Sequence, residues 1–137
     1  MRNLFSAMLL VTFATPAFAA APVTGRWLTT EKDSIIEIGQ CGATVCGKIA
    51  KILRPTKDGK PPFDTNNPNP ALRTRPIDGL VILSGFVANG QSWKGSIYDP
   101  RAGKTYTSYL TKLANGNLKV QGCVGPFCKS FVYTPTN

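Results

Sequence analysis

Residues 79–98 read GLVILSGFVANGQSWKGSIY, two short runs rich in β-branched and aromatic residues that are joined by Asn89-Gly90. The run Val81 to Leu83 is apolar on both faces, and residues 93–97 alternate between apolar or small and polar side chains, as in a strand with one buried face. Asn-Gly tolerates positive φ at both central positions of a tight turn. The stretch therefore predicts a β-hairpin.

The same pattern continues on both sides of this hairpin, with Asn115-Gly116 and the segment 99–103 as further turn signals. About eight antiparallel strands in one small chain favour an all-β fold, either a closed up-and-down β-barrel or a compact sandwich, with the barrel preferred because closure removes exposed sheet edges. Small barrels of this size are filled by side chains or hold one small ligand. The predicted strands lie near residues 23–30, 34–39, 46–53, 79–88, 92–98, 104–113, 117–123 and 127–134.

One long irregular loop interrupts this rhythm. Residues 54–78 read RPTKDGKPPFDTNNPNPALRTRPID, with six prolines and no strand pattern, although residues 68–72 could form one helical turn. Connections of this length without regular structure are uncommon and are usually functional or disordered. The loop is interpreted either as a lid that contacts a ligand across a barrel mouth, or as a cap whose Asp and Asn side chains bond to their own backbone.

The N-terminus has the order of a secretory signal peptide. Arg2 precedes the apolar run 4–13, and the small-residue stretch 17–21 follows Pro16. The apolar run is too short to span a bilayer as a helix. We expect a signal peptide at residues 1–19, with cleavage after Ala19 or else after Ala21, and a single β-barrel domain at residues 20–137; a buried N-terminal helix is the alternative. The mature chain shows no transmembrane segment, and we expect it in the periplasm or secreted.

The chain is basic, with a formal charge of +9 that falls to +8 when Arg2 leaves with the signal peptide. This charge favours a small anionic or amphipathic ligand or an envelope component as partner, or it serves only solubility. Nucleic acid is not expected, because the protein is exported and its basic residues are spread along the chain. The oligomeric state is left open.

The four cysteines form two C-x4-C pairs, Cys41/Cys46 and Cys123/Cys128. An even number in a small exported domain argues for disulfides, and we favour the two local bridges over the two crossed pairings because each pair brackets a loop that contains glycine. A tetrathiolate zinc site is the rival, against which export and the wide spacing both speak. We expect no metal and no cofactor.

Four further stretches carry a family resemblance: Gly25-x-Trp27-x-Thr29, residues 46–49 (CGKI), residues 64–80 (DTNNPNPALRTRPIDGL) and residues 97–106 (IYDPRAGKTY). Together they resemble the uncharacterised bacterial family catalogued as domain of unknown function 2147. The resemblance implies an exported bacterial protein and carries no catalytic residues to transfer. Gly25-Arg26-Trp27 also resembles the G-x-W of lipocalin- and avidin-like barrels, which implies that Trp27 plugs one end of the barrel; otherwise it is an ordinary buried tryptophan.

The chemistry available to the chain is narrow. It contains no histidine, and the cysteines are expected to be oxidised, so the usual nucleophile pairs are missing. Asp64, Asp78 and Asp99 could supply two carboxyl groups for a hydrolase, but nothing in the sequence brings two of them together. We expect no catalytic residues and no enzyme activity.

A non-catalytic binding module fits these residues better. The candidate ligand-binding residues are in the long loop and around the turn at 99–103, where arginine suits carboxylate or phosphate and tyrosine adds aromatic surface. The alternatives are an internal clamp, in which Asp64 pairs with Arg73 or Arg75, and a structural or interaction protein with a filled barrel. The candidates are Asp64, Asn67, Arg73, Arg75, Tyr98 and Tyr106.

Overall fold

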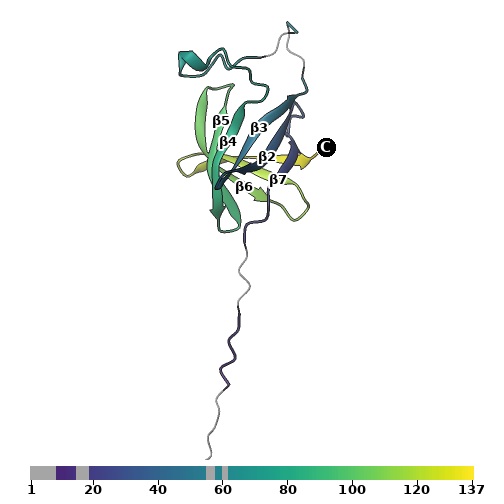
Figure 1. Cartoon of the computed structure of the whole chain (residues 1–137), viewed down its shortest axis with the longest axis vertical. Coiled ribbons are helices and arrows are strands. Elements are labelled where there is room, and N and C mark those ends of the chain that lie inside the picture. The colour runs from purple at the N-terminus through teal and green to yellow at the C-terminus, as the bar shows by residue number, and fades with distance from the viewer. Residues whose placement is uncertain (1–8, 15–18, 55–57, 60–61) are drawn as a thin grey trace, which may run out of the picture.

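The computed structural model describes residues 9–14, 19–54, 58–59 and 62–137. Parts of the predicted signal peptide (residues 1–8 and 15–18) and of the long loop (55–57 and 60–61) lie outside the described residues. In the described part, eight antiparallel strands form a closed up-and-down barrel (Figure 1). The strands are β1 Gly25–Leu28, β2 Ser34–Cys41, β3 Thr44–Ile52, β4 Val81–Asn89, β5 Ser92–Asp99, β6 Lys104–Lys112, β7 Leu118–Val124 and β8 Phe127–Pro135.

Each strand pairs with the next, and β1 pairs with β8 through Trp27 opposite Pro135 and Leu28 opposite Thr134. The predicted all-β barrel is therefore confirmed, and the sandwich alternative is wrong. The predicted strands match the observed ones within a few residues at their ends. The turn of the β4–β5 hairpin differs from the prediction by one residue. Its central residues are Gly90 and Gln91 rather than Asn89 and Gly90, and of these two only Gly90 has positive φ.

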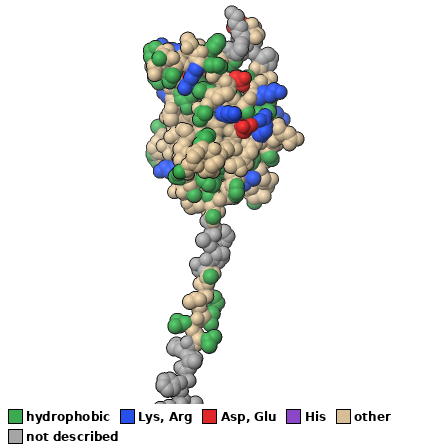
Figure 2. All heavy atoms as spheres, in the orientation of Figure 1, with side chains coloured by type: hydrophobic (Ala, Val, Ile, Leu, Met, Phe, Trp, Pro, Cys, Tyr) green, Lys and Arg blue, Asp and Glu red, His purple; other side chains and the backbone are tan. Residues whose placement is uncertain are grey.

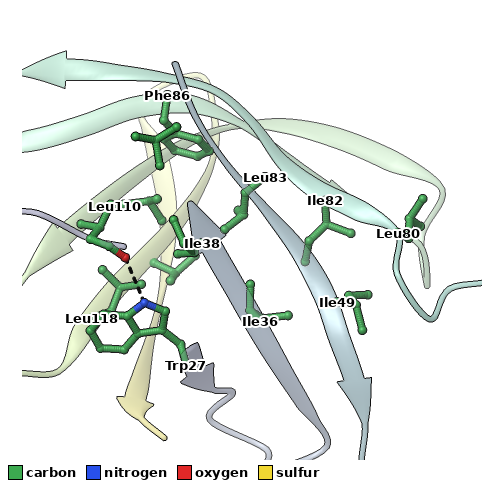
Figure 3. Packing of buried hydrophobic residues seen from close by; sticks show 13 residues of the cluster. Trp27, Ile36, Ile38, Ile49, Leu80, Ile82, Leu83, Phe86, Leu110 and Leu118 are labelled. Atoms are coloured by element: carbon green, nitrogen blue, oxygen red, sulfur yellow. Dashed lines mark hydrogen bonds between the residues drawn. The ribbon is translucent and has the colours of Figure 1, made fainter. Parts of the chain in front are cut away.

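Half of the barrel interior is filled by apolar side chains. Trp27, Phe86, Leu110 and Leu118 are buried there together, each pointing inward from its strand (Figure 3). Gly95 allows this packing, because a Cβ atom at that position would lie 2.7 Å from the Phe86 ring. Burial of each large side chain contributes roughly 1.5–3 kcal/mol relative to exposure. The packed side chains therefore close the interior of the barrel at this end.

Trp27 lies at the filled end, where its ring is buried next to Leu118 (Figure 3). Its indole N–H donates a hydrogen bond to the carbonyl oxygen of Val23 at 3.0 Å, and the Lys112 ammonium group lies 5.2 Å from the centroid of its ring. The segment before β1 also packs at this end, since the Trp93 indole N–H donates to the carbonyl oxygen of Ala21 at 2.9 Å. The N-terminal chain leaves the barrel here (Figure 1).

Because the strands run alternately up and down, the β1–β2, β3–β4, β5–β6 and β7–β8 connections share the opposite end, which we call the mouth. The long β3–β4 connection lies there, away from the N-terminal tail (Figure 1). None of the described residues form a helix long and apolar enough to cross a membrane.

Candidate functional site: the mouth of the barrel

The long β3–β4 connection is fixed around one buried carboxylate. Asp64 is 0% exposed, and its carboxylate accepts hydrogen bonds from the Tyr98 hydroxyl (2.6 Å), the Asn67 side-chain amide (2.9 Å) and Nε of Arg75 (2.9 Å). The backbone closes the same unit, because the Asp64 amide donates to the carbonyl oxygen of Arg75 at 3.0 Å. This is the arrangement of the internal clamp, with Arg75 as the partner.

The electrostatics of Asp64 follow from these contacts. Burial alone would raise its pKa, but the hydrogen bonds from Tyr98, Asn67 and Arg75, together with the charge of Arg75, outweigh burial and hold the pKa of Asp64 below its usual value. The same geometry raises the pKa of Tyr98, through burial first and then through the bond to the carboxylate. Asp64 is therefore ionised at neutral pH, and its carboxylate anchors the described part of the loop to β5.

The described residues 65–73 of the loop are bonded mainly to one another. Nε of Arg73 donates to the backbone carbonyl of Asn67 at 2.8 Å, and the Asn67 side-chain oxygen accepts from the backbone amide of Asn69 at 2.8 Å. Asn69 in turn caps a short 3₁₀ helix, η1 (Pro70–Leu72), which falls within the segment predicted to form one helical turn. These contacts are those expected of a self-bonded cap.

The loop also docks on the β5–β6 connection. The Asn66 side-chain amide donates to the carbonyl oxygen of Arg101 at 3.0 Å. Gly103 lies so close to the Asn66 backbone that a Cβ atom there would overlap it, and its φ is +65°, a conformation that side chains other than glycine rarely adopt. The glycine that ends the turn at 99–103 is thus required by the loop that packs over it.

The mouth half of the barrel encloses a cavity of about 730 Å³. This volume lies in the range of small-molecule sites, roughly 300–1,000 Å³. Its deep wall is aliphatic and comes from four strands, and Gly122 of β7 adds no side chain there, which leaves the space open. The four aliphatic residues are Ile36, Ile49, Ile82 and Ile97.

Charged side chains gather at the rim of the cavity. Glu31, Asp33 and Asp99 line it together with Arg54, Arg101 and Lys129. On the face drawn in Figure 2, most acidic and basic side chains lie at the end of the barrel away from the N-terminal tail. Among the described residues, no three His, Cys, Asp or Glu side chains are arranged as a metal site.

One arginine contacts two of the rim carboxylates. Nη1 of Arg101 lies 3.4 Å from Oε2 of Glu31, and its Nε lies 3.4 Å from Oδ1 of Asp99. The third rim carboxylate, Asp33, has a lowered pKa. Burial alone would raise it, but hydrogen bonds with Thr29 and Ser34 and the charges of Arg101 and Arg54 together outweigh burial. Within the described part of the chain, no ion pair is formed by Arg54 or Lys129.

Aromatic rings form the remaining wall: Tyr98, Tyr106, Phe127, Phe131 and Tyr133. The Tyr98 hydroxyl is turned away to Asp64, and the Arg75 guanidinium lies 5.7 Å from the centroid of its ring. Burial, followed by the negative charge of Asp33, raises the pKa of Tyr133 to about 12. Tyr133 lines the cavity, and within the described part of the chain its hydroxyl forms no hydrogen bond.

The structure separates the six candidate ligand-binding residues into two groups. Tyr98 and Tyr106 line the cavity, whereas Asp64, Asn67, Arg73 and Arg75 lie in the loop beside it and do not. Sequence reasoning missed the rim charges and the deep isoleucines. Inward alternation along the last strand, 127–129–131–133, was a usable signal for one wall, but which strand ends meet at the mouth depends on the closed topology.

The two disulfides have the local pairing. Cys41–Cys46 joins the ends of the β2–β3 hairpin at the filled end, and Cys123–Cys128 joins the β7–β8 hairpin at the mouth. All four cysteines are used, since no cysteine in the described chain is free. Only the second bridge therefore shapes the rim of the cavity.

The model of one protein family, described as "Uncharacterized protein conserved in bacteria (DUF2147)", matches residues 25–134, which span the barrel almost from end to end. The chain belongs to this family. The predicted family resemblance is thereby confirmed. A search of curated proteins gives no match.

Among solved structures, this chain is similar to one described as "Protein HP1028 from the human pathogen Helicobacter pylori belongs to the lipocalin family". The two share 27% sequence identity with a TM-score of 0.73, and the match covers 86% of this chain and 85% of the other. The lipocalin-like fold expected from the G-x-W segment is thus confirmed.

Proposed function

We propose that this protein is an exported, non-catalytic binding protein of the bacterial cell envelope, which holds a small amphipathic ligand in the barrel with an anionic group at the mouth. The observation that carries the proposal is the cavity of about 730 Å³, closed below by the filled half of the barrel and open at the mouth. The likeness to a protein described as a lipocalin supports it.

The distribution of side chains along the cavity supports an amphipathic ligand. Ile36, Ile49, Ile82 and Ile97 offer only apolar surface in the deep part, whereas charges and tyrosine hydroxyls occur toward the rim. Moving an alkyl chain from water to such a wall is favourable by roughly 25 cal/mol per Å² of apolar surface. A ligand that is polar at one end satisfies both zones.

The rim supports an anionic polar end. Arg101 already forms ion pairs with Glu31 and Asp99, so its positive charge is compensated within the protein. Arg54 and Lys129 line the same rim without a carboxylate at ion-pair distance in the described chain, although Arg54 donates to the backbone carbonyl of Glu31 at 3.1 Å and its charge acts on Asp33. An incoming carboxylate or phosphate would pair with these two cations.

The Asp33 carboxylate at the rim supports a non-catalytic role. Glycoside cleavage needs one carboxyl group with a raised pKa as the acid, and the pKa of Asp33 is lowered instead. The chain also has no histidine to act as a general base. Export is proposed from the signal-peptide pattern at residues 1–21, and the two disulfides are compatible with it.

A pair of glycine variants tests the proposal. Gly122 lines the cavity, and a Cβ atom there would meet only Ile97 at 3.8 Å, so Gly122→Leu should fold and fill the cavity. Gly39 of β2 has nothing within 4 Å of its would-be Cβ and does not line the cavity, so Gly39→Leu is the matched control. Titration with a fluorescent fatty acid should show saturable binding to the unchanged protein and to Gly39→Leu, and at least tenfold weaker binding to Gly122→Leu.

The same titration tests the charge of the ligand. A fatty alcohol and a fatty amine of equal chain length should compete less well than the fatty acid, and Arg54→Gln with Lys129→Gln should remove this preference. Absence of saturable binding of all three amphiphiles, or equal binding to both glycine variants, would contradict the proposal.

A further inference from the structure

The β7–β8 hairpin ends in an exposed apolar tip at the mouth. Val124 and Phe127 face each other at the last pair of the hairpin and are 66% and 80% exposed. In the barrel, from Gly25 to Pro135, they are the two most exposed large hydrophobic side chains that the structure describes. Contiguous exposed apolar side chains at one end of a domain are typical of an interaction site, which makes the tip a candidate for contact with an external partner.

The tip is held rigidly. The pair directly below it, Cys123 and Cys128, is joined by a disulfide. Gly125 completes the turn with a φ of +56°, and Pro126, whose ring fixes its own φ, follows it. The two apolar side chains therefore project as a preformed unit, so little conformational entropy is lost when they insert into a partner.

Two cations without an ion-pair partner in the described chain, and further apolar side chains, lie at the same end of the barrel as the tip, where the rim also carries Glu31, Asp33 and Asp99. Lys129 lies two residues after Phe127 on the same face of β8, and its ammonium group lies 5.2 Å from the Phe131 ring centroid. Arg54 lines the same mouth, again without an ion-pair partner in the described chain. The β3–β4 connection at this end exposes three more large apolar side chains, Leu53, Phe63 and Leu72.

We propose that the mouth of the barrel docks onto a phospholipid bilayer with anionic head groups, and that Val124 and Phe127 insert among the acyl chains. A protruding tip of two side chains is too small for a stable protein interface, which buries about 1,200–2,000 Å² in total. A bilayer accepts a small apolar wedge, and cations at its base complement anionic head groups. Lys129 lies at the base of the tip on β8, and Arg54 lines the same mouth.

The docked orientation has a consequence for the cavity. Phe127 and Val124 both line the cavity as well as forming the tip. Insertion would therefore place the open end of the cavity directly against the membrane, so that an amphipathic molecule could pass between barrel and bilayer without crossing water. This consequence rests on the proposed ligand-binding function, whereas the docking itself does not.

Vesicle flotation tests the docking. The protein is purified from the periplasmic extract of expressing cells, with its N-terminus read by mass spectrometry. It is then mixed with vesicles of phosphatidylcholine alone or with one third phosphatidylglycerol. We expect binding to the anionic vesicles that weakens with salt, and at least tenfold weaker binding by the double variant Val124→Ser/Phe127→Ser. Val87→Ser is the matched control, because Val87 is 50% exposed near the opposite end of the barrel.

A positional probe makes the test independent of affinity. Tryptophan placed by Phe127→Trp should be quenched by brominated acyl chains, and tryptophan placed by Val87→Trp should not. The docking proposal is overturned if the protein does not float with anionic vesicles, if Val87→Ser weakens flotation as much as Val124→Ser/Phe127→Ser does, or if Phe127→Trp and Val87→Trp are quenched equally. Gly122→Leu separates the two proposals, because it should lose fatty-acid binding through the filled cavity and should still float with anionic vesicles through its unchanged tip.

Discussion

The hydroxyl group of Tyr98 donates a 2.6 Å hydrogen bond to Oδ1 of Asp64, and so joins the wall of the cavity to a carboxylate buried under the β3–β4 connection. The same carboxylate holds Asn67 and Arg75 through Oδ2. This side chain is thus one of the contacts that hold the described part of the loop on the barrel. The loop in turn supplies Pro62 and Ile77 to the lining of the cavity.

Removal of this carboxylate should destabilise the protein. Asp64→Ala leaves the Tyr98 hydroxyl and the Asn67 amide without their charged acceptor, and hydrogen bonds to charged groups contribute about 1.5–3 kcal/mol each. We expect the free energy of unfolding, measured with urea, to fall by about 2–4 kcal/mol. Tyr98→Phe, which loses only one of the bonds, should cost clearly less. Equal stability of Asp64→Ala and the unchanged protein would show that the loop is held by other contacts.

The clamp also predicts acid sensitivity. Because the pKa of Asp64 is lower in the folded chain than in the unfolded chain, its contribution to stability is present above the unfolded pKa of about 3.9 and is lost as the pH falls through the lower folded value. The difference in the free energy of unfolding between the unchanged protein and Asp64→Asn should therefore shrink between about pH 6 and pH 3. A constant difference over that interval would refute the assignment.

Tyr133 predicts the opposite sign at alkaline pH. Its pKa is raised to about 12 by burial and by the charge of Asp33, so its contribution to stability is complete below the unfolded pKa of about 10 and is lost as the pH rises toward 12. The free energy of unfolding should fall less steeply in Tyr133→Phe than in the unchanged protein over this range. At neutral pH the variant should remain close to the unchanged protein, because the hydroxyl has no partner in the described chain. Identical alkaline slopes would contradict this position for the ring.

The two disulfides should affect different ends of the molecule. Each links cysteines five positions apart, so the loss of either should lower the free energy of unfolding by only about 2 kcal/mol in the chain-entropy model. Both the Cys41→Ser/Cys46→Ser and the Cys123→Ser/Cys128→Ser variants should therefore still fold. Only the second should weaken vesicle flotation, because only that bridge lies beneath the apolar tip. Equal flotation of the two variants would show that membrane binding by the tip does not depend on the Cys123–Cys128 disulfide.

Much of the fold could be predicted from local pattern. Alternation in the run 93–97 and turn signals such as Asn115-Gly116 report which segments are strands, because side-chain direction in a strand has a period of two. The mouth was harder to predict. Glu31, Arg54 and Arg101 are remote in sequence and meet only because alternate connections share one end of a closed barrel. No local signal encodes that meeting.

The contacts of the long loop could also be predicted only in part. Asp64 and Arg75 could be chosen as a possible pair from their chemistry, but their sequence allowed both a clamp and a ligand site. The deciding partner, Tyr98, lies 34 residues from Asp64 on a strand of the barrel. Its bond to the carboxylate depends on how the loop folds back on β5, which composition does not specify.

Native mass spectrometry of the protein, taken from the extracytoplasmic fraction of the bacteria that make it, tests ligand binding in the cavity most directly. We predict a single bound amphipathic molecule on the unchanged protein and on Gly39→Leu, and none on Gly122→Leu, whose new side chain occupies the cavity. Protein that carries no bound mass in any of the three forms, or the same bound mass on both glycine variants, would contradict the account.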